Sequence, residues 1–390
     1  MGQSKVMKLS LICVRLRRRV YFALISCLSA LACTDLPRPP VPEAPANGVI
    51  LVTASDFTSA FLSTVVVAEN RVVRDVVPLY NDTILRYSSQ DTATYAIQRL
   101  GSDALRRLSN AAGYTTVYER SLKAQSNPQD VAFLPDNRMA VSYYNRNEIA
   151  ILDRQSGAQV ATVDLSAFAD SDGYAEIAGL AYVGGALYAA VQRLNRAATD
   201  AIWPPTGQSY LVKIHTTTYL PVKSTLLTHA NPVSRLHYHA GRNSLVFAAP
   251  ERYYANSALD GACLEYDLAS DTLLTPPITE AEAGYEIADC QIYPDGTGVF
   301  VGNDLSLNSV LGVFNPVSKT VSQIAAQLSS TNGGYFSDFL LHSNGRLYLA
   351  DRNIYRPGVR VFVKSGGVLS EYTANPLYTG LPPFVLEEVP

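Results

Sequence analysis

Four aspartates recur at matching places along the sequence, each three residues before an apolar residue of a predicted strand. They are Asp82, Asp130, Asp289 and Asp338. Two further repeats of the pattern carry Ser234 and Gly179 at this place. In five repeats the next predicted strand ends at an arginine, namely Arg99, Arg146, Arg193, Arg252 and Arg352. Carboxylate and guanidinium groups with this spacing can pair with one another or bind a small ion or molecule together.

Two roles are open for these charges. In the first, each carboxylate accepts backbone hydrogen bonds or pairs with an arginine, and so holds neighbouring repeats together. In the second, the charges form a ring that binds a cation or an anionic small molecule. Recurrence in most repeats favours the first role, because a binding site seldom needs a residue from every repeat. The ring would comprise Asp82, Asp130, Asp289, Asp338, Arg99, Arg193 and Arg352.

A second group of carboxylates lies in the segment ADSDGYAE, which contains Asp170, Asp172 and Glu176. Asp-x-Asp-Gly places hard oxygen ligands on a tight turn, as calcium sites require. The segment lacks the third aspartate and the twelfth-position glutamate of an EF-hand loop. A turn capped by its own carboxylates is therefore favoured over a calcium site, and no other cofactor is expected.

Two predicted loops carry aromatic residues. NRAATDAIWPPTGQS contains the only tryptophan, Trp203, and PERYYANSALDGA contains Tyr253 and Tyr254. Both loops should lie on the same face as the aspartates and arginines. Exposed aromatic side chains on neighbouring loops could contact a protein or a glycan. Alternatively, Trp203 could pack as a lid over its own repeat.

Motifs of common enzyme classes are absent from the sequence. It has no Gly-x-Ser-x-Gly, no His-x-x-x-His and no Cys-x-x-Cys-His. His237 and His239 should share one face of a strand, since side chains alternate along strands. Two histidines alone do not make a metal site. We therefore expect a binding protein more than an enzyme.

The elements that must position these residues are short strands in a repeated order. NPQDVAFL, RMAVSYY, EIAILD and AQVATVDL, all within residues 127–166, predict four strands separated by turns. The same order returns in units that begin near residues 82, 175, 231, 286 and 335. Strand meanders that repeat about every 40 to 55 residues, and cannot bury both faces alone, predict a β-propeller.

Two fragments remain outside these six units. Residues 49–79 predict three strands and residues 382–389 predict one. Together they complete a seventh blade, in which the two ends of the chain pair and leave no open edge. We therefore predict an all-β, seven-bladed β-propeller with four-stranded antiparallel blades over residues 49–390.

The unit at residues 127–166 resembles the YVTN-type β-propeller repeat of bacterial surface and periplasmic proteins. Its PDNR, VSYYN and IAILD segments fall where that repeat has PDG, YV-x-N and V-x-V-I-D. The resemblance extends over about residues 49–389 and is closest in the units at 127 and 286. It implies the fold, whereas the wider superfamily includes lactonase-like, quinoprotein-like and binding proteins. In its N-terminal signal, its Pro-rich tether and the segment SAFADSDGYAEIAGLAYV…QRLNR, the chain is also similar to propeller lipoproteins of Gram-negative bacteria.

Residues 1–32 have the pattern of a secretion signal. Lysines and arginines precede the apolar segment VYFALISCLSALA, and no acidic residue occurs among them. Ala30-Leu31-Ala32 before Cys33 fits an ordinary signal peptidase site or a lipobox, although Ala30 stands where a lipobox usually has leucine. The Pro-rich segment that follows suits an extended tether. A lipidated Cys33 with a tether over residues 33–48 is thus favoured over simple secretion.

Processing would change the charge and the cysteine content of the chain. Without residues 1–32, 25 of the 31 lysines and arginines remain against 34 acidic residues. Such an acidic protein is a poor candidate for nucleic-acid binding. Cys263 and Cys290 are the only cysteines after residue 33. Outside the cytoplasm they could form a disulfide, or they could be two buried apolar side chains.

These observations predict a lipid-anchored binding or scaffold propeller of the bacterial cell surface or outer membrane. Thr34, rather than Asp, follows Cys33, which suits the outer membrane; a periplasmic or secreted protein is the alternative. We expect a monomer that touches the membrane only through its lipid and binds an envelope protein, a surface protein or a glycan. The alternative function is a lactonase-like or other hydrolase with calcium as its metal. Its site would be the mouth of the central channel of the propeller, where the aspartates and arginines are expected.

Overall fold

The structure is a computed structural model that describes residues 44–111, 113–198, 203–253 and 258–390. The predicted signal peptide, Cys33 and most of the predicted tether lie outside the described residues, as does Tyr254. Within the described ranges, no helix has the length and apolar character needed to span a membrane.

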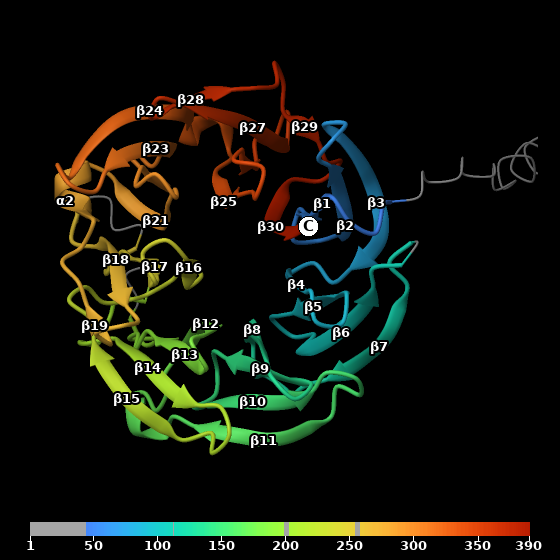
Figure 1. Cartoon of the computed structure of the whole chain (residues 1–390), viewed down its shortest axis with the longest axis vertical. Helices are drawn as coiled ribbons and strands as arrows, with labels where there is room; N and C mark the ends of the chain where they lie inside the picture. Colours follow the sequence, from blue (N-terminus) through green and yellow to red (C-terminus); the bar gives the residue numbers. More distant parts are fainter. Residues whose placement is uncertain (1–43, 112, 199–202, 254–257) are drawn as a thin grey trace, which may run out of the picture. The chain divides into compact units, whose positions relative to one another are not determined.

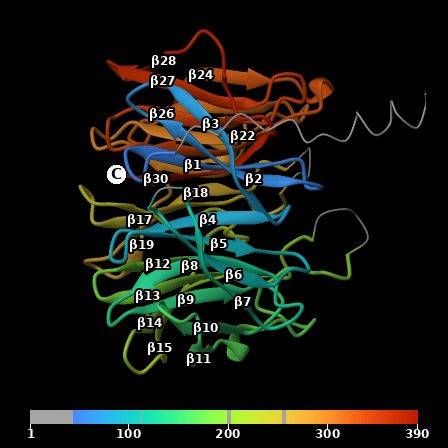
Figure 2. The ribbon, with the colours of Figure 1, turned by 90° about the vertical axis from the view of Figure 1, so that its right-hand side faces the viewer.

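The described residues form seven antiparallel sheets around a common axis, which confirms the predicted seven-bladed β-propeller (Figure 1). We number the blades 1 to 7 in chain order. In blades 2 to 7 the first strand lies nearest the axis and the following strands lie progressively farther out. In the side view, the strands of blades 1, 2 and 3 follow one another from top to bottom (Figure 2).

The strands of the first four blades have the following bounds. Blade 1 contains β1 (Val49–Ser55), β2 (Ala60–Val66), β3 (Arg71–Leu79) and β30 (Pro383–Val389). Blade 2 contains β4 (Thr83–Ser88), β5 (Ala93–Gln98), β6 (Ala104–Ser109) and β7 (Thr116–Ser121). Blade 3 contains β8 (Pro128–Leu134), β9 (Arg138–Tyr143), β10 (Glu148–Asp153) and β11 (Gln159–Asp164). Blade 4 contains β12 (Ile177–Val183), β13 (Ala186–Val191), β14 (Tyr210–His215) and β15 (Pro221–Leu226).

Blades 5 and 7 each carry one additional short strand, and in the described part of the chain three short helices lie between strands. Blade 5 contains β16 (His237–His239), β17 (Ser244–Ala249), β18 (Ala262–Asp267), β19 (Thr272–Leu273) and β20 (Ile278–Thr279). Blade 6 contains β21 (Glu286–Ile292), β22 (Gly298–Asn303), β23 (Ser309–Asn315) and β24 (Thr320–Leu328). Blade 7 contains β25 (Phe336–Leu341), β26 (Leu347–Asp351), β27 (Gly358–Ser365), β28 (Val368–Glu371) and β29 (Leu377–Tyr378). The helices are η1 (Ser166–Phe168), α2 (Glu280–Ala283) and η2 (Ser330–Asn332).

Blade 1 closes the ring by pairing the two ends of the propeller. β30 is its innermost strand and pairs antiparallel with β1, with Val49 opposite Val389. The packed region also begins before β1, because Ala44 is buried and the backbone oxygen of Pro45 accepts a hydrogen bond from the Tyr114 hydroxyl. The last residues of the predicted tether, 44–48, therefore belong to the packed structure.

The hydrophobic core lies between neighbouring blades. One cluster joins Ile149 and Ile151 of blade 3 with Leu187 and Val212 of blade 4. Both faces of a blade thus meet an apolar neighbour, so the middle strands of each sheet are buried on both sides, whereas outer strands such as β7 and β15 are largely exposed. Blades 5 and 6 are also joined covalently, because Cys263 of β18 and Cys290 of β21 form a disulfide. This pairing is the first of the two alternatives that the sequence left open.

Candidate functional site

β-bulges direct three of the recurring aspartates toward the axis. The innermost strand of four blades shifts its register near its start, between Pro128 and Val131, Ile177 and Leu180, Ile287 and Asp289, and Phe336 and Phe339. A bulge bends the strand and re-aims a side chain. Asp130, Asp289 and Asp338 lie at three of these bulges. Gly179 takes the place in β12, where a Cβ would lie 3.0 Å from the backbone oxygen of Ser234.

Asp82 does not share this position. β4 pairs with β5 in unbroken register from Thr83 to Ser88, so blade 2 lacks the bulge. Asp82 lies just before the strand, where its Oδ1 accepts a 2.6 Å hydrogen bond from Nη2 of Arg99 in the same blade. Ile84 and Arg86 line the axis instead. The prediction that Asp82 occupies the same position as the other three aspartates is therefore wrong.

Asp130 uses both carboxylate oxygens within the fold. Its Oδ1 accepts hydrogen bonds from Nε of Arg86 in blade 2, at 2.7 Å, and from its neighbour Val131 N, at 2.8 Å. Its Oδ2 accepts a hydrogen bond from Leu180 N in blade 4, at 2.9 Å. The side chain is buried. Asp130 therefore ties three consecutive blades together, which is the structural role that the sequence favoured.

Asp338 differs from Asp130, because only one of its two carboxylate oxygens accepts a hydrogen bond from the described residues. Its Oδ2 accepts a 2.7 Å hydrogen bond from Leu386 N of blade 1 and lies 3.8 Å from Nη2 of Arg235. Its Oδ1 has no hydrogen-bond partner among the described residues. Burial raises the pKa of the Asp338 carboxyl above its usual range, and the negative charge of Asp289 adds to this against the opposing effect of Arg235.

Asp289 is held by a histidine. Nε2 of His237, from blade 5, lies 3.0 Å from Oδ1 and 3.2 Å from Oδ2 of Asp289. The same Oδ1 accepts a hydrogen bond from Cys290 N at 2.8 Å. Within the described part of the chain, no lysine or arginine nitrogen lies within 4.0 Å of this carboxylate. Asp289 is thus fixed in orientation without a permanent positive partner.

Arg235 crosses the axis between blades that are far apart in the sequence. It comes from the segment before β16, and its Nη1 donates a 2.8 Å hydrogen bond to Oε2 of Glu387 in β30. Its Nη2 donates to the backbone oxygen of Leu386 at 3.0 Å. Nη1 of Arg86 also lies 4.0 Å from Oε2 of Glu387. The charges therefore form one network from Asp130 to Asp338 through two arginines and Glu387.

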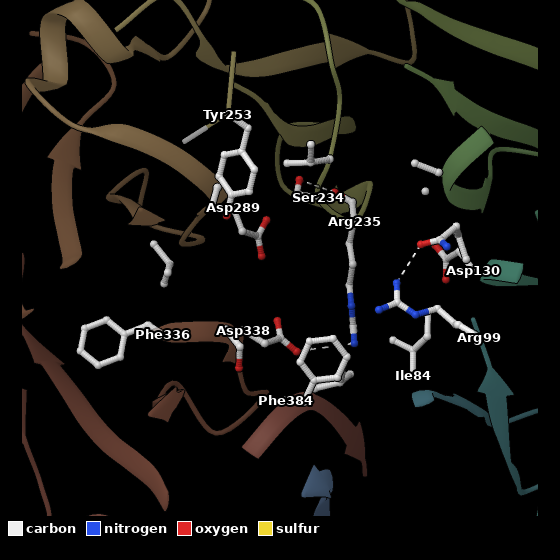
Figure 3. A pocket seen from close by; sticks show the side chains of 18 of the residues that line it. Ile84, Arg99, Asp130, Ser234, Arg235, Tyr253, Asp289, Phe336, Asp338 and Phe384 are labelled. Carbon is white, nitrogen blue, oxygen red and sulfur yellow. Dashed lines mark hydrogen bonds and ion pairs between the residues drawn. The ribbon is translucent and has the colours of Figure 1, made fainter. Parts of the chain in front are cut away.

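These side chains border a cavity on the propeller axis, which we call the axial cavity. Its volume is about 300 Å³, and residues near the start of the innermost strand of all seven blades line it. Asp289, Asp338 and Arg235 are directed toward the same hollow, whose other walls include Phe336 and Phe384 (Figure 3). Concave sites with apolar walls and a few convergent polar groups are typical of small-molecule binding.

The arginines predicted for the ring lie elsewhere or are fully engaged. Arg99 lines the axial cavity but is fixed between Asp82 and Oε1 of Gln129, to which its Nη1 donates at 2.8 Å. Arg193 lies over the ring of Tyr210 and donates to the Gln208 backbone oxygen.

Arg352 is also removed from the aspartates. It is buried, and Nη2 donates a 3.0 Å hydrogen bond to the backbone oxygen of Ser55 in blade 1. Its Nη1 donates to the carbonyls of Pro382 and Pro383 at 3.3 Å. Arg193 and Arg352 therefore do not join the ring, because backbone carbonyl groups nearer to each guanidinium accept its hydrogen bonds.

The carboxylates proposed for calcium have other partners. Glu176 is fully buried, and its Oε1 accepts a 2.6 Å hydrogen bond from Nε of Arg196. Oδ2 of Asp170 accepts from the Thr206 hydroxyl at 2.6 Å, and Oδ1 of Asp172 accepts from Tyr174 N at 2.9 Å. Burial raises the pKa of Glu176 to about 7. Among the described residues, no three His, Cys, Asp or Glu side chains gather into a metal-binding group.

The aromatic loops border a second, smaller cavity, which we call the aromatic slot. It has a volume of about 190 Å³ and is lined by Tyr144, Gln192, Leu194, Trp203, Asn231, Val233 and Tyr253. Tyr253 and Val233 also line the axial cavity, so the two cavities adjoin. Trp203 is 40% exposed and is stacked with Tyr144 at a centroid distance of 6.4 Å. Trp203 and Tyr253 thus line a cavity that adjoins the one lined by Asp289 and Asp338.

Several residues of this region were not identified from the sequence. Arg86, Arg235 and Glu387 provide the charges of the network, and the His237 ring contacts Asp289, whereas the predicted arginines pair with an aspartate only at Asp82. One signal was present: Arg235 directly follows Ser234, which takes the aspartate place in its repeat. The partners of Arg235 lie about 150 residues later in the chain, and no local pattern connects them.

Comparisons with known proteins show the fold of the chain, but they do not assign it to a family. No family model matches the chain, and no match was found among curated proteins. One similar solved structure, from Bacteroides fragilis, carries the provisional name 6-phosphogluconolactonase. It is 11% identical with a TM-score of 0.60, covering 87% of this chain and 96% of that one. Another, the periplasmic gluconolactonase of Pseudomonas aeruginosa, is 12% identical with a TM-score of 0.52, covering 88% and 99%.

A third similar structure is the dihydro-heme d1 dehydrogenase NirN. It is 13% identical with a TM-score of 0.54, and the match covers 92% of this chain and 78% of that one. The three proteins have different named activities, and identities this low show a shared fold alone. By fold, the chain is a seven-bladed β-propeller.

Proposed function

We propose that this chain is a binding module that holds a small, donor-rich ligand in the axial cavity. The observation that carries the proposal is the contrast among the bulge aspartates. Asp130 is engaged on both oxygens, whereas Asp338 keeps Oδ1 without a partner among the described residues and is directed toward the cavity with Asp289 (Figure 3). A carboxylate oxygen that faces the cavity without such a partner can accept a hydrogen bond from a ligand.

The charge balance of the cavity supports a ligand with several polar groups. Asp289 and Asp338 accept hydrogen bonds, while Arg235 and Arg99 stand nearby with most of their donors already engaged. Phe336 and Phe384 offer apolar surface to the carbon skeleton. A neutral polyol or an amine fits this combination better than an anion, because free hydrogen-bond acceptors outnumber free donors in the cavity.

The test is a thermal-shift screen of small polyols, sugars and amines against three forms of the protein. The wild type should be stabilised by some compounds that leave the Asp289→Asn/Asp338→Asn double variant unshifted. Glu119→Gln is the matched control, because it removes a negative charge from an exposed position in the outermost strand of blade 2. Compounds that stabilise the double variant as strongly as the wild type would contradict the axial site.

We further propose that the module is anchored in the bacterial envelope through a lipid on Cys33. The support is the sequence of residues 1–48, with its basic and apolar leader, small residues before Cys33 and Pro-rich segment. The intact mass of the protein from the membrane fraction tests this. A mass that begins at Cys33 and includes acyl chains is expected, and an unlipidated mass would contradict the anchor.

Lactone hydrolysis at the same cavity is a second candidate. The favouring observation is the pair of acids, with Asp289 held by His237 and the pKa of Asp338 raised by burial. Asp289 would take a proton from an attacking water. Protonated Asp338 would give one to the ring oxygen as its bond to the carbonyl carbon breaks, so that one water is added overall.

A pH-stat assay with glucono-δ-lactone tests this second candidate. After subtraction of spontaneous hydrolysis, the wild type should release acid faster than Asp289→Asn or Asp338→Asn, by a factor of about 100 if proton transfer is the main contribution. Equal rates in the wild type and both variants would rule out the pair as acid and base.

A further inference from the structure

Two residues that line the aromatic slot carry buried amide oxygens without partners among the described residues. Gln192 is 4% exposed and Asn231 is 3% exposed. Nε2 of Gln192 donates a 3.1 Å hydrogen bond to the Pro232 carbonyl, and Nδ2 of Asn231 donates a 2.9 Å hydrogen bond to the Glu251 carbonyl. These donors fix which end of each amide is oxygen. Oε1 of Gln192 and Oδ1 of Asn231 then remain unpaired within the described ranges.

Unpaired buried acceptors are costly. Leaving such a group without a partner costs about 1–3 kcal/mol. Two of them on one small cavity therefore indicate a place for hydrogen-bond donors. The remaining walls are largely aromatic, from Tyr144, Trp203 and Tyr253. The slot thus offers flat faces together with two acceptors, which matches a flat ring that carries donors at its edge.

The slot has its own cation close by, which restricts the charge of such a ring. The Arg196 guanidinium lies 5.1 Å from the Tyr144 ring centre and 5.4 Å from that of Trp203. Its position is fixed, because Nε donates to Glu176 and Nη2 donates a 2.7 Å hydrogen bond to the Tyr144 carbonyl. These rings already interact with one positive charge, so a second cation beside them would be repelled. A neutral ring with hydroxyl groups is favoured.

We propose that the aromatic slot and the axial cavity are adjoining subsites for a saccharide. One sugar ring stacks in the slot and donates hydroxyl groups to Gln192 and Asn231. The next ring lies in the axial cavity, where its hydroxyl groups donate to Asp289 and Asp338. Tyr253, which lines both cavities, stands at the junction. This inference rests on the proposed binding function and names its ligand class.

The only tryptophan of the chain gives a direct readout of the slot. Because Trp203 is the sole tryptophan, the intrinsic emission of the protein reports on this cavity. The probes are cellobiose, maltose, N,N′-diacetylchitobiose and their monosaccharides, with choline as the cationic comparison. We expect at least one disaccharide to change the emission with saturation and to bind about tenfold more tightly than its monosaccharide.

Substitutions in the slot should weaken that binding. Gln192→Met removes one acceptor with little change of volume, and it should raise the Kd of the disaccharide about tenfold. Asn231→Gly removes the other acceptor, and its φ of 63° suits glycine, so it provides a second variant if the first folds poorly. Gln159→Met, on the exposed outermost strand of blade 3, is the matched control and should leave the Kd unchanged.

The outcomes separate this inference from the proposed function. In one outcome, disaccharide binding is lost in Asp289→Asn but unchanged in Gln192→Met and Asn231→Gly, and the tryptophan emission does not change. This outcome would support the axial site and contradict sugar binding in the slot. Binding that depends on the slot but not on Asp289 and Asp338 would overturn the two-subsite arrangement. An emission change with choline and with no saccharide, or with no probe, would overturn the assignment to saccharides.

Discussion

Asp130 and Asp289 lie at equivalent bulges of blades 3 and 6, yet their surroundings differ. Asp130 receives Arg86 from the preceding blade and a backbone N–H from the following one. Among the described residues, Asp289 receives an imidazole from the preceding blade and the N–H of its own neighbour, Cys290, and no arginine or lysine. The same backbone device thus serves two purposes. At Asp130 the bulge connects neighbouring blades, and at Asp289 it presents a carboxylate to the axial cavity.

The difference shows how a repeated scaffold acquires a site. The bulge recurs in β8, β12, β21 and β25, and it re-aims one side chain of the innermost strand in each of these blades. Which side chain stands on the preceding blade then decides the role. An arginine engages the acid fully, whereas a histidine in that place, as at His237, leaves the acid without a permanent charge partner.

Asp130→Ala should have the largest effect on stability. It leaves the partly buried Arg86 without its closest carboxylate and Leu180 N without its acceptor. Removing one partner of a buried ion pair costs about 3–5 kcal/mol. Chemical denaturation should therefore show a much lower unfolding midpoint than for Asp289→Ala. Equal midpoints for the two variants would contradict the division of roles.

The Asp289→Asn/Asp338→Asn double variant should lose binding while remaining folded. A loss of at least tenfold in affinity for any ligand of the axial cavity corresponds to about 1.4 kcal/mol. The amide side chains keep the shape and most hydrogen bonds to the backbone, so the melting temperature without ligand should change little. Thermal shifts with and without ligand check both parts, and Glu119→Gln serves as the reference.

Asp338 should also contribute to the pH dependence of stability. Its pKa is raised in the folded state, so the folded protein keeps this proton after the unfolded chain has released it near pH 3.9. Its contribution is fully present below that pH and is lost as the pH rises through the folded-state pKa. Asp338→Asn should flatten this part of the stability profile, as measured by denaturation at a series of pH values. A slope unchanged from the wild type would contradict the raised pKa.

Asp82→Asn should have the smallest effect. Asp82 lies outside the bulge, and its partner Arg99 also has Gln129. The asparagine still offers an oxygen to Arg99, so we expect a loss of about 1 kcal/mol in stability and no change in ligand affinity. An effect as large as that of Asp130→Ala would show that Asp82 has the same structural role after all.

The repeat made the propeller predictable from the sequence, including the pairing of β30 with β1. Strand alternation and turn residues are local signals, so each unit could be recognised separately. Asp130, Asp289 and Asp338 aligned correctly for the same reason. Asp82 was misplaced because a bulge adds one residue to a strand without a distinct sequence signal, and β4 has none.

The partners of the aspartates could not be predicted in this way. Arg235 reaches Glu387 across the axis, between blades 5 and 1, and only the closure of the ring brings them together. The amide oxygens of Gln192 and Asn231, which lack partners among the described residues, could not be recognised from the sequence either. Their role depends on which backbone carbonyls accept from the other end of each amide, and these are set by the packing of blades 4 and 5.

The most direct test compares Asp130→Asn with Asp289→Asn by calorimetric titration of the compound that binds the wild type most tightly. Both variants replace one carboxylate by an amide at an equivalent bulge. If Asp130 connects the blades and Asp289 contacts the ligand, the Kd of Asp130→Asn should lie within about threefold of the wild-type Kd. The Kd of Asp289→Asn should be at least tenfold higher. An equal loss in both variants, or a loss in Asp130→Asn alone, would contradict the assignment of the axial cavity to ligand binding through Asp289.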